Sequence, residues 1–396
     1  MNNINTTIQN QTPAILSLGF RPFFLLACLF AIISMMIWSG FLNFSLPVKF
    51  NGINPVYWHA HEMVYGYSLA VIAGFLLTAI KNWTGVQTLY GKPLLILCGL
   101  WITSRLLYLL ETPYSIYINL IIENIFILGL TIAISQPIIK VKQWKQIPVI
   151  SKIIIFLIGN IIYGLGLINV LEQGEKWGIY IGLYTVLALL FMMARRVIPF
   201  FIENAADCPV KLKNWKWLDI ASLVFFLAFS ILDIFFTAPV LLAIVTTALV
   251  ILHSIRLAGW YTHELWKKPL SWVLYIAYSF IVFGFFLKLI SLTTDLNPYL
   301  SIHAFSFGGI GVITVGMMTR VSLGHTGRNV FQPPRILPII FALMIIGSIF
   351  RVILPIISTP NIHLWLIFSQ GFWIISFLLL LFHLLPMLSQ PRIDEK

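Results

Sequence analysis

Long apolar runs follow one another along the whole chain, and short segments with Pro, Gly, Asn or charged residues separate them. A helix needs roughly 20 mostly apolar residues to cross a bilayer. Of the 396 residues, 59% are hydrophobic and 10% are charged, whereas about a quarter of a soluble domain is charged. The pattern excludes a water-soluble fold and predicts an all-α, polytopic integral membrane protein with about 12 transmembrane helices.

The breaks between the apolar runs define the ends of the predicted spans. These spans are approximately 23–44, 58–80, 93–110, 116–135, 147–171, 178–200, 216–236, 238–260, 270–292, 302–322, 336–357 and 362–388. Residues 23–388 then form a single helical bundle between an N-terminal segment, 1–22, and a tail, 389–396. The loops are too short to hold a soluble catalytic domain, so any chemistry must lie within or at the edge of the bundle.

The Lys and Arg residues test this count independently, because positive charge concentrates on the cytoplasmic side of a membrane. With both termini cytoplasmic, the outer loops hold only Lys49 and Lys176, Arg105, Lys288 and Arg351 fall inside spans, and the other 20 lie on the inner side. A miscounted helix would invert part of this pattern. We therefore expect a multi-pass membrane protein, with the lipid bilayer as a partner.

Charge and cysteine content narrow the function further. The net charge of +12 does not indicate a nucleic-acid partner, because the basic residues are scattered between apolar runs. Cys28, Cys98 and Cys208 form neither Cys-x-x-Cys nor Cys-x-x-Cys-His, which argues against a disulfide framework and against covalent haem attachment. The polar N-terminal segment lacks a basic region followed by an apolar core, so no cleaved signal is expected.

Several ionisable residues map to the outer halves of predicted spans. They are Arg105, Glu123, Asp233, Lys288 and Arg351. A charge near the bilayer centre costs about 2.5 kcal/mol or more, so such residues usually face the bundle interior or water. Two interpretations stay open: structural pairing of acids with bases, or a polar cavity whose basic groups hold anionic substituents such as haem propionates.

The eight histidines divide into two groups by their predicted side of the membrane. The outer group is His59, His61, His303 and His363, and the inner group is His253, His325, His383 and the loop residue His263. From His303 to Arg320 a helix rises roughly 25 Å. The two groups therefore cannot share one metal ion.

The strongest local signal is Trp58-His59-Ala60-His61-Glu62-Met63. Imidazole is the commonest protein ligand for transition metals, and the thioether of Met63 would favour Cu(I). On a regular helix His59 and Met63 share a face, whereas His61 points about 160° away from His59. One metal ion could take both histidines only if His59 precedes the helical turn. Histidines that only form hydrogen bonds at the membrane surface are the alternative.

The second and tenth spans resemble each other. Each has a histidine followed by two glycines at the same spacings: His61, Gly66 and Gly74, and His303, Gly308 and Gly316. Small residues recur in membrane helices because they permit close packing, which is one explanation. The other is that two imidazoles lie near the same depth while the glycines leave room for a flat macrocycle, as in axial ligation of b-type haem.

The inner end of the tenth span has glycines on both sides of His325. Glycine allows tight turns and close approach of a ligand or of another backbone. The segment is either a helix end with cytoplasmic arginines or part of an inner metal, anion or proton-handling site that involves His253 and His325. The sequence contains no P-loop, nucleotide-binding glycine fingerprint or His-Glu-x-x-His motif.

Longer motifs, in order along nearly the whole chain, resemble those of the NnrS family of membrane proteins. They are Gly19-Phe20-Arg21-Pro22-Phe23-Phe24, His59-Ala60-His61-Glu62-Met63, Ala73-Gly74-Phe75-Leu76-Leu77-Thr78-Ala79, Asn82-Trp83-Thr84-Gly85, Arg196-Val197-Ile198-Pro199-Phe200-Phe201, Leu252-His253 with Arg256-Leu257, and Gly316-Met317-Met318 leading into Gly324-His325-Thr326-Gly327-Arg328. Tyr275 stands where many members have a histidine. A phenol is a poorer copper ligand than an imidazole, so this difference weakens the inner group as a copper site.

The resemblance implies haem b and copper as cofactors, and a role in denitrification and in resistance to nitric oxide. Nitric oxide or a related small molecule would be the partner, and the resemblance implies a place in the bacterial inner (cytoplasmic) membrane. From the resemblance and the predicted depths together, the candidate cofactor-binding residues are His61, His303, Arg105 and Arg351, and the candidate metal ligands are His59, His61, Glu62, Met63, His303, His253 and His325. His61 and His303 would be the haem ligands, with the two arginines near the propionates.

Two other functions stay open. Twelve helices would suit a transporter of haem, copper or a small solute, although the sequence shows no convincing repeat of six helices. An accessory protein that assembles or supplies another metalloenzyme is the third interpretation. The sequence identifies neither an electron donor nor the number of metals bound, and it leaves open whether turnover occurs.

Overall fold

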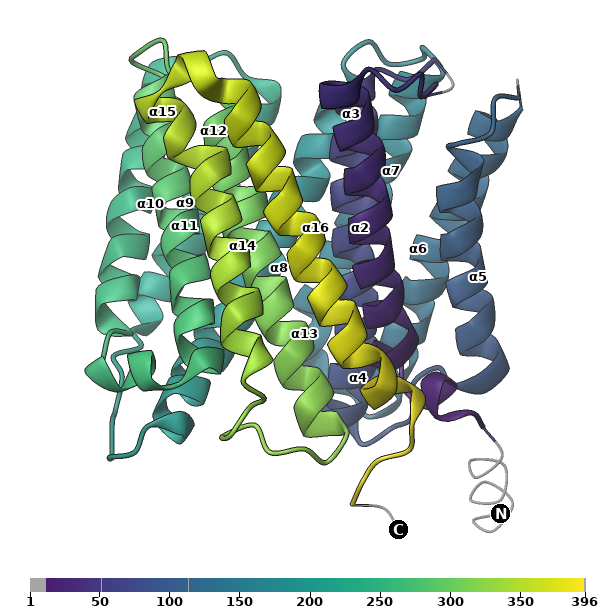
Figure 1. Cartoon of the computed structure of the whole chain (residues 1–396), viewed down its shortest axis with the longest axis vertical. Coiled ribbons are helices and arrows are strands. Elements are labelled where there is room, and N and C mark those ends of the chain that lie inside the picture. The colour runs from purple at the N-terminus through teal and green to yellow at the C-terminus, as the bar shows by residue number, and fades with distance from the viewer. Residues whose placement is uncertain (1–11, 51, 113, 395–396) are drawn as a thin grey trace. The chain divides into compact units, whose positions relative to one another are not determined.

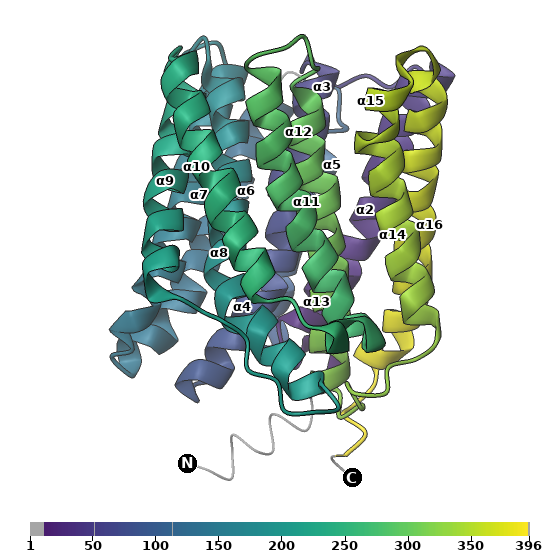
Figure 2. The ribbon, with the colours of Figure 1, turned by 90° about the vertical axis from the view of Figure 1, so that its left-hand side faces the viewer.

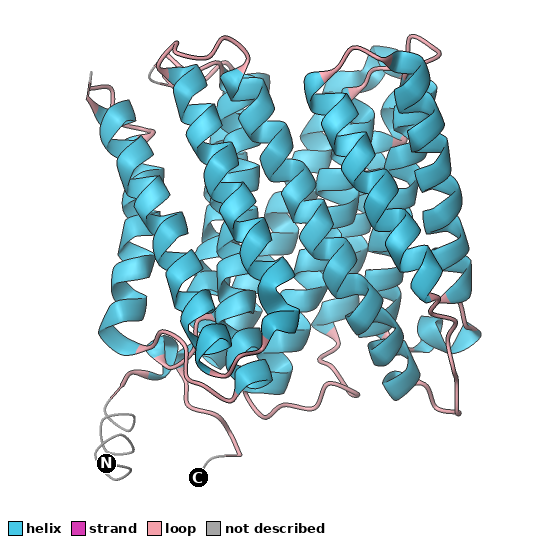
Figure 3. Cartoon of the chain, turned by 180° about the vertical axis from the view of Figure 1, so that it is seen from behind, coloured by secondary structure: helices cyan, strands magenta, loops and turns pink. Residues whose placement is uncertain are grey.

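The computed structural model describes residues 12–50, 52–112 and 114–394, and within these ranges it contains helices but no strand (Figure 3). In the described ranges, 11 helices are long and apolar enough to cross a membrane. The remaining predicted span, 93–110, corresponds to α5 (Gly91–Leu107), whose 17 residues rise roughly 26 Å. That length is close to the thickness of the hydrocarbon core. The prediction of an all-α polytopic membrane protein is confirmed.

The chain divides into two compact units. Unit 1 comprises Met1–Gly182, Val321–Arg328 and Phe377–Lys396, and unit 2 comprises Leu183–Arg320 and Asn329–Ser376. Three helices have residues in both units: α8 (Gly174–Ala205), α13 (Val312–His325) and α16 (Ile362–Ser389). The single bundle expected over residues 23–388 stays a prediction.

Unit 1 is built around helices from the first half of the chain. They are α2 (Phe20–Phe44), α3 (Pro55–His61), α4 (Leu69–Thr84), α5, α6 (Ser115–Lys140) and α7 (Ile147–Leu167), with short 3₁₀ turns at Ala14–Leu16 and Trp144–Gln146. Helix α2 packs on α4, and α6 contacts α4, α5 and α7; α5 and α6 lie side by side in Figure 1. Phe23 and Ile127 are fully buried, whereas Ile96 and Ile121 are exposed. Apolar side chains on the outside of a helix suit contact with lipid.

Unit 2 contains the helices of the second half. They are α9 (Lys216–Phe235), α10 (Pro239–Gly259), α11 (Pro269–Ser291), α12 (Tyr299–His303), α14 (Ile336–Val352) and α15 (Leu354–Ile357), with 3₁₀ turns at His263–Lys267 and Thr359–Asn361. Proline in the first turn starts α10 and α11, where its missing N–H costs no hydrogen bond. Helix α10 packs against both α9 and α11 (Figure 2).

Helices α7 and α8 cross in unit 1 at glycines. A Cβ atom on Gly178 would lie 2.6 Å from the carbonyl oxygen of Gly159 and 2.6 Å from the backbone nitrogen of Tyr163. Backbone atoms cannot move aside as a side chain can. Glycine therefore sets how closely these two helices approach, as is common in membrane helix pairs.

We expect Gly178→Ala to destabilise the protein by about 1–3 kcal/mol, because the added methyl group overpacks the crossing of α7 and α8. Gly99→Ala on α5 is the matched control, since a Cβ atom there would meet no neighbouring atom within 4 Å. In a helix alanine is favoured over glycine, so the control should not lose stability. Thermal unfolding of the purified variants measures the difference, and equal unfolding temperatures would contradict the assignment.

Candidate functional site

The two histidines that the matching sequence pattern singled out each precede a π-helical segment. His61 ends α3, immediately before η2 (Glu62–Ser68), and His303 ends α12, immediately before η5 (Ala304–Gly311). π-Helical turns are rare and appear frequently at functional sites. The two segments with the same spacing of histidine and glycine therefore also have the same π-helical backbone. The sequence analysis assumed regular helices of 3.6 residues per turn and did not predict these π-helical turns.

Side chains of neighbouring helices pack directly against glycines in these π-helical segments. A Cβ atom on Gly308 would lie 2.8 Å from the Cβ atom of Phe280, and one on Gly66 would lie 2.9 Å from Nη1 of Arg105. Close packing therefore accounts for both positions. These contacts give no support to their interpretation as clearance for a macrocycle.

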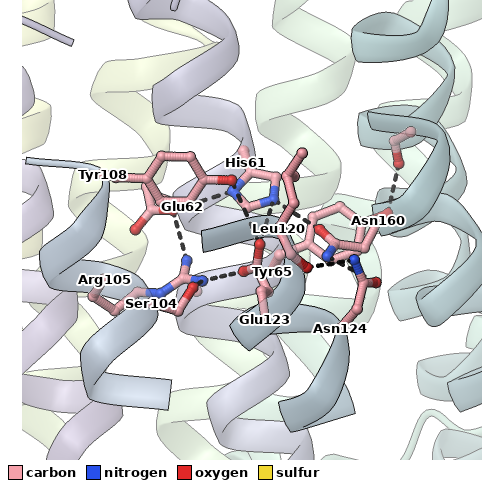
Figure 4. Close-up of polar contacts among 12 residues, drawn as sticks. His61, Glu62, Tyr65, Ser104, Arg105, Tyr108, Leu120, Glu123, Asn124 and Asn160 are labelled. Atoms are coloured by element: carbon pink, nitrogen blue, oxygen red, sulfur yellow. Dashed lines mark hydrogen bonds and ion pairs between the residues drawn. The ribbon is translucent and has the colours of Figure 1, made fainter. Parts of the chain in front are cut away.

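Arg105 is the centre of a buried ion cluster in unit 1 (Figure 4). Its Nη1 donates to Oε1 of Glu62 at 2.6 Å, and its Nη2 donates to Oγ of Ser104 at 2.8 Å and pairs with Glu123. The arginine comes from α5, Glu62 from η2 and Glu123 from α6. The cluster therefore ties three segments together through charge-assisted hydrogen bonds, which help to offset the loss of hydration of buried charges.

His61 completes this cluster through both ring nitrogens. Nδ1 lies 3.1 Å from Oε1 of Glu62, and Nε2 lies 3.0 Å from Oδ1 of Asn160 and 3.4 Å from Oε2 of Glu123. Two carboxylates face one guanidinium, so the cluster holds one excess negative charge if the imidazole is neutral. An imidazolium would balance that charge and give each nitrogen a proton to donate.

Aromatic stacking fixes the two neighbouring histidines in different surroundings. The ring of His61 stacks on Tyr65 and Tyr163, with centroids 4.8 and 4.2 Å away and 20° between the planes in both cases. His59 instead stacks on Trp38, with centroids 4.5 Å apart. The structure therefore does not bring His59 and His61 to one point.

Unit 2 brings His303 and Arg351 together. Nδ1 of His303 bonds to the carbonyl oxygen of Tyr299 on the same helix at 2.8 Å, so this nitrogen carries the proton. Nη2 of Arg351 lies 2.9 Å from Nε2, which is then the accepting nitrogen. Within the described ranges, no carboxylate pairs with Arg351. The cationic guanidinium of Arg351 therefore donates a hydrogen bond to a neutral imidazole ring.

One other pair of charges inside the spans of unit 2 is neutral overall. Nζ of Lys288 lies 2.5 Å from Oδ1 of Asp233, and the hydroxyl of Tyr184 donates to the other carboxylate oxygen. Together with the pair of Arg105 and Glu123, this contact shows that acids and bases inside the spans do pair. Arg351 differs from both pairs.

His253 is the most enclosed histidine of unit 2. Its Nδ1 lies 2.5 Å from the hydroxyl of Tyr278, and its ring stacks on Phe191 and Phe285. Among the described residues, its Nε2 has no hydrogen-bond partner. A buried nitrogen without a partner is costly, so this position has either a structural reason or a ligand.

The remaining candidates lie apart from these contacts. In unit 1, Nε2 of His325 is 3.2 Å from Nδ2 of Asn82, and Met63 lies partly buried in η2. In unit 2, the hydroxyl of Tyr275 donates to the carbonyl oxygen of Leu257. The described structure therefore collects Arg105, Glu62 and His61 in one cluster.

Several contributors to the cluster were not predicted, among them Ser104, Tyr65 and three further residues. Asn160, Tyr108 and Tyr163 are buried beside the charged groups. Asn160 does carry a signal, because an amide inside an apolar span needs a hydrogen-bond partner. The tyrosines carry none, since aromatic residues are common throughout this chain.

A copper site made of several protein ligands does not fit the described structure. Among the described residues, no group of three or more His, Cys, Asp or Glu side chains is placed to hold a metal ion. Haem requires only one or two axial protein ligands. Single histidines of the described structure could therefore serve as axial ligands of haem.

The fold and the buried charges define a multi-pass membrane protein with ionisable groups inside its spans. No curated protein matches the chain. The model of one family, described as NnrS protein, matches residues 14–392. The chain therefore belongs to the NnrS family, and the resemblance seen in its motifs is confirmed.

Proposed function

We propose that this protein binds haem b through His303 and responds to nitric oxide in a bacterial inner membrane. Its family supports the class of function. The observation that carries the haem site is the contact between His303 and Arg351. The bond from Nδ1 to the Tyr299 carbonyl orients the ring and leaves Nε2 as the acceptor, and metal-binding histidines are typically held in this way. Iron would take the Nε2 lone pair that Arg351 now contacts, so the guanidinium would have to leave the ring and turn to the haem carboxylates.

Arg351 fits the carboxylates of a haem. It is partly buried and, within the described ranges, has no acid partner. Haem carries two propionate groups, and pairs of arginine with carboxylate are among the strongest hydrogen-bonded contacts in proteins. Bound haem would supply an iron atom able to take nitric oxide as a ligand. The role of the protein is to orient the imidazole and to neutralise the carboxylates.

His61 as a second haem ligand stays a prediction. Both of its ring nitrogens are hydrogen-bonded to oxygen atoms, so iron could bind only after one of these contacts breaks. Arg105 as a propionate partner also stays a prediction, because Glu62 and Glu123 already share its charge. Copper is implied by the family alone.

Optical spectra of the purified full-length protein test the proposal. We expect a Soret band of about one haem per chain, and a shift of that band when nitric oxide is added to the reduced protein. Protein that folds in haem-replete cells and carries no haem would contradict the proposal. Uptake of haem or copper into proteoliposomes by haem-free protein would favour a transporter instead.

A further inference from the structure

A cavity of about 510 Å³ opens near the C-terminal end of α8 in unit 2. Arg195, Arg196, Phe200 and Glu203 from α8 line one side, and Asn214 from the loop that leads into α9 lines the other. The cavity combines two guanidinium groups with an exposed aromatic ring. It shares no residue with the contact between His303 and Arg351.

Proline inside α8 explains how the cavity is built. Pro199 has no N–H, so the carbonyl oxygen of Arg195, four residues earlier, loses its partner in the helix. The side chain of Asn214 donates to this oxygen at 3.2 Å. Oε1 of Glu203 accepts the backbone N–H of Leu212 at 2.7 Å. The loop is thereby fastened to α8 at two points, on either side of the cavity.

The charges around the cavity leave an excess of positive charge. Asp219 pairs with both Arg195 and Arg256, so two guanidinium groups share one carboxylate. Glu203 also lines the cavity and accepts the N–H of Leu212, so three arginines face two carboxylates and one positive charge remains. Arg196 is exposed and has no acid partner within the described ranges. The cavity therefore offers Arg196 to an anion.

Neighbouring acids in the loops do not compensate this excess. Asp207 pairs with Lys268 and Glu264 pairs with Lys267, each at 2.6 Å. The hydrogen bond from Lys268 lowers the pKa of Asp207, and that from Lys267 lowers the pKa of Glu264. Both carboxylates are therefore ionised and already occupied near neutral pH, and neither is available to Arg196.

An apolar surface continues from the cavity. Phe200 is 57% exposed, and α9, which starts just after Asn214, exposes Trp217, Ile220 and Leu223 by more than half. Exposed aromatic and aliphatic side chains of this kind face the interface and the acyl chains of a membrane. Arg196 and Phe200 are four residues apart on α8 and so share one face of the helix.

We propose that this cavity binds an acidic phospholipid. The phosphodiester pairs with Arg196, while the acyl chains lie along Phe200 and the exposed face of α9. Basic pockets at the ends of membrane helices recognise anionic headgroups by the same combination of charge and apolar surface. A soluble phosphate would contact only Arg196 and would leave the apolar surface at Phe200 and α9 unused.

Lipid titration of the purified, delipidated full-length protein tests this site, with binding followed by native mass spectrometry. The probes are phosphatidylglycerol, phosphatidylethanolamine and inorganic phosphate. We expect tighter binding of phosphatidylglycerol than of phosphatidylethanolamine, and a Kd about tenfold weaker in Arg196→Ala, which loses a charged hydrogen-bond donor. Lys211→Ala removes an equal charge from the loop that leads into α9, outside the cavity lining, and should keep the affinity within about twofold.

Three outcomes would overturn the proposal. Equal binding of the two lipids would show that the headgroup charge is not recognised, and equal losses in Arg196→Ala and Lys211→Ala would show diffuse attraction only. Full competition by inorganic phosphate at the same concentration would assign the cavity to a free anion. Unfolding temperatures without lipid check that each variant is folded, and Arg196→Gln replaces the alanine variant if that variant is not.

Discussion

Arg105→Ala should prevent stable folding of unit 1. The substitution leaves Glu62 and Glu123 buried without their shared cation, and removing one partner of a buried ion pair costs about 3–5 kcal/mol. That is a large part of the roughly 5–15 kcal/mol that stabilises a typical domain. The yield of folded protein and its thermal unfolding temperature in detergent measure the effect.

An exposed ion pair in the same unit is the matched control. Lys49 and Glu111 lie 3.0 Å apart, and their side chains are 73% and 49% exposed. Lys49→Ala should therefore cost at most about 1 kcal/mol. A triple variant, Arg105→Met with Glu62→Gln and Glu123→Gln, should recover part of the lost stability because no uncompensated charge remains. Equal losses in Arg105→Ala and Lys49→Ala would show that burial of the cluster is unimportant.

His303→Ala should abolish the haem spectrum of the purified protein. The proposal gives this histidine the bond from the chain to iron, with its ring oriented by the Tyr299 carbonyl. His363→Ala is the control, since His363 is exposed on α16 in the same unit. We expect a normal Soret band from the control, and partial recovery of the band in His303→Gly when imidazole is added.

A variant of Arg351 distinguishes the effect of the iron ligand from the effect of the neighbouring positive charge. Arg351→Gln removes the cation while leaving His303 and its bond to the Tyr299 carbonyl in place. Haem should then bind about tenfold or more weakly, because a charged hydrogen bond contributes about 1.5–3 kcal/mol, but the Soret position should stay the same. Normal haem content in folded His303→Ala would overturn the assignment of the ligand whatever Arg351→Gln shows.

Some of the site was visible in the sequence. Arg105 and Glu123 stood out as charges inside apolar spans, where the cost of burial makes pairing the natural outcome. The parallel between His61 and His303 was also visible as a shared spacing. The structure added that the two histidines differ, since His61 is enclosed by oxygen atoms and tyrosine rings, whereas His303 faces a cation without an acid partner.

Other parts of the site depend on contacts between distant segments. Asn160 reaches His61 from 99 positions along the chain, and Arg351 reaches His303 from 48. Sequence periodicity places a residue on a face of its own helix but does not say which helix that face meets. The two π-helical segments were missed for the same reason, because a local widening of a helix depends on its neighbours more than on its own residues.

By itself, the sequence determined the class of protein, the approximate ends of the spans and the family. These follow from local properties, since the length of an apolar run decides whether a helix crosses a bilayer and ordered motifs identify relatives. Only the tertiary structure decided which charges are neutralised and which histidine nitrogens are already bonded. Hydrogen bonds and ion pairs form only when side chains of different helices lie within a few ångströms of each other. The spacing of residues along the sequence does not determine that distance.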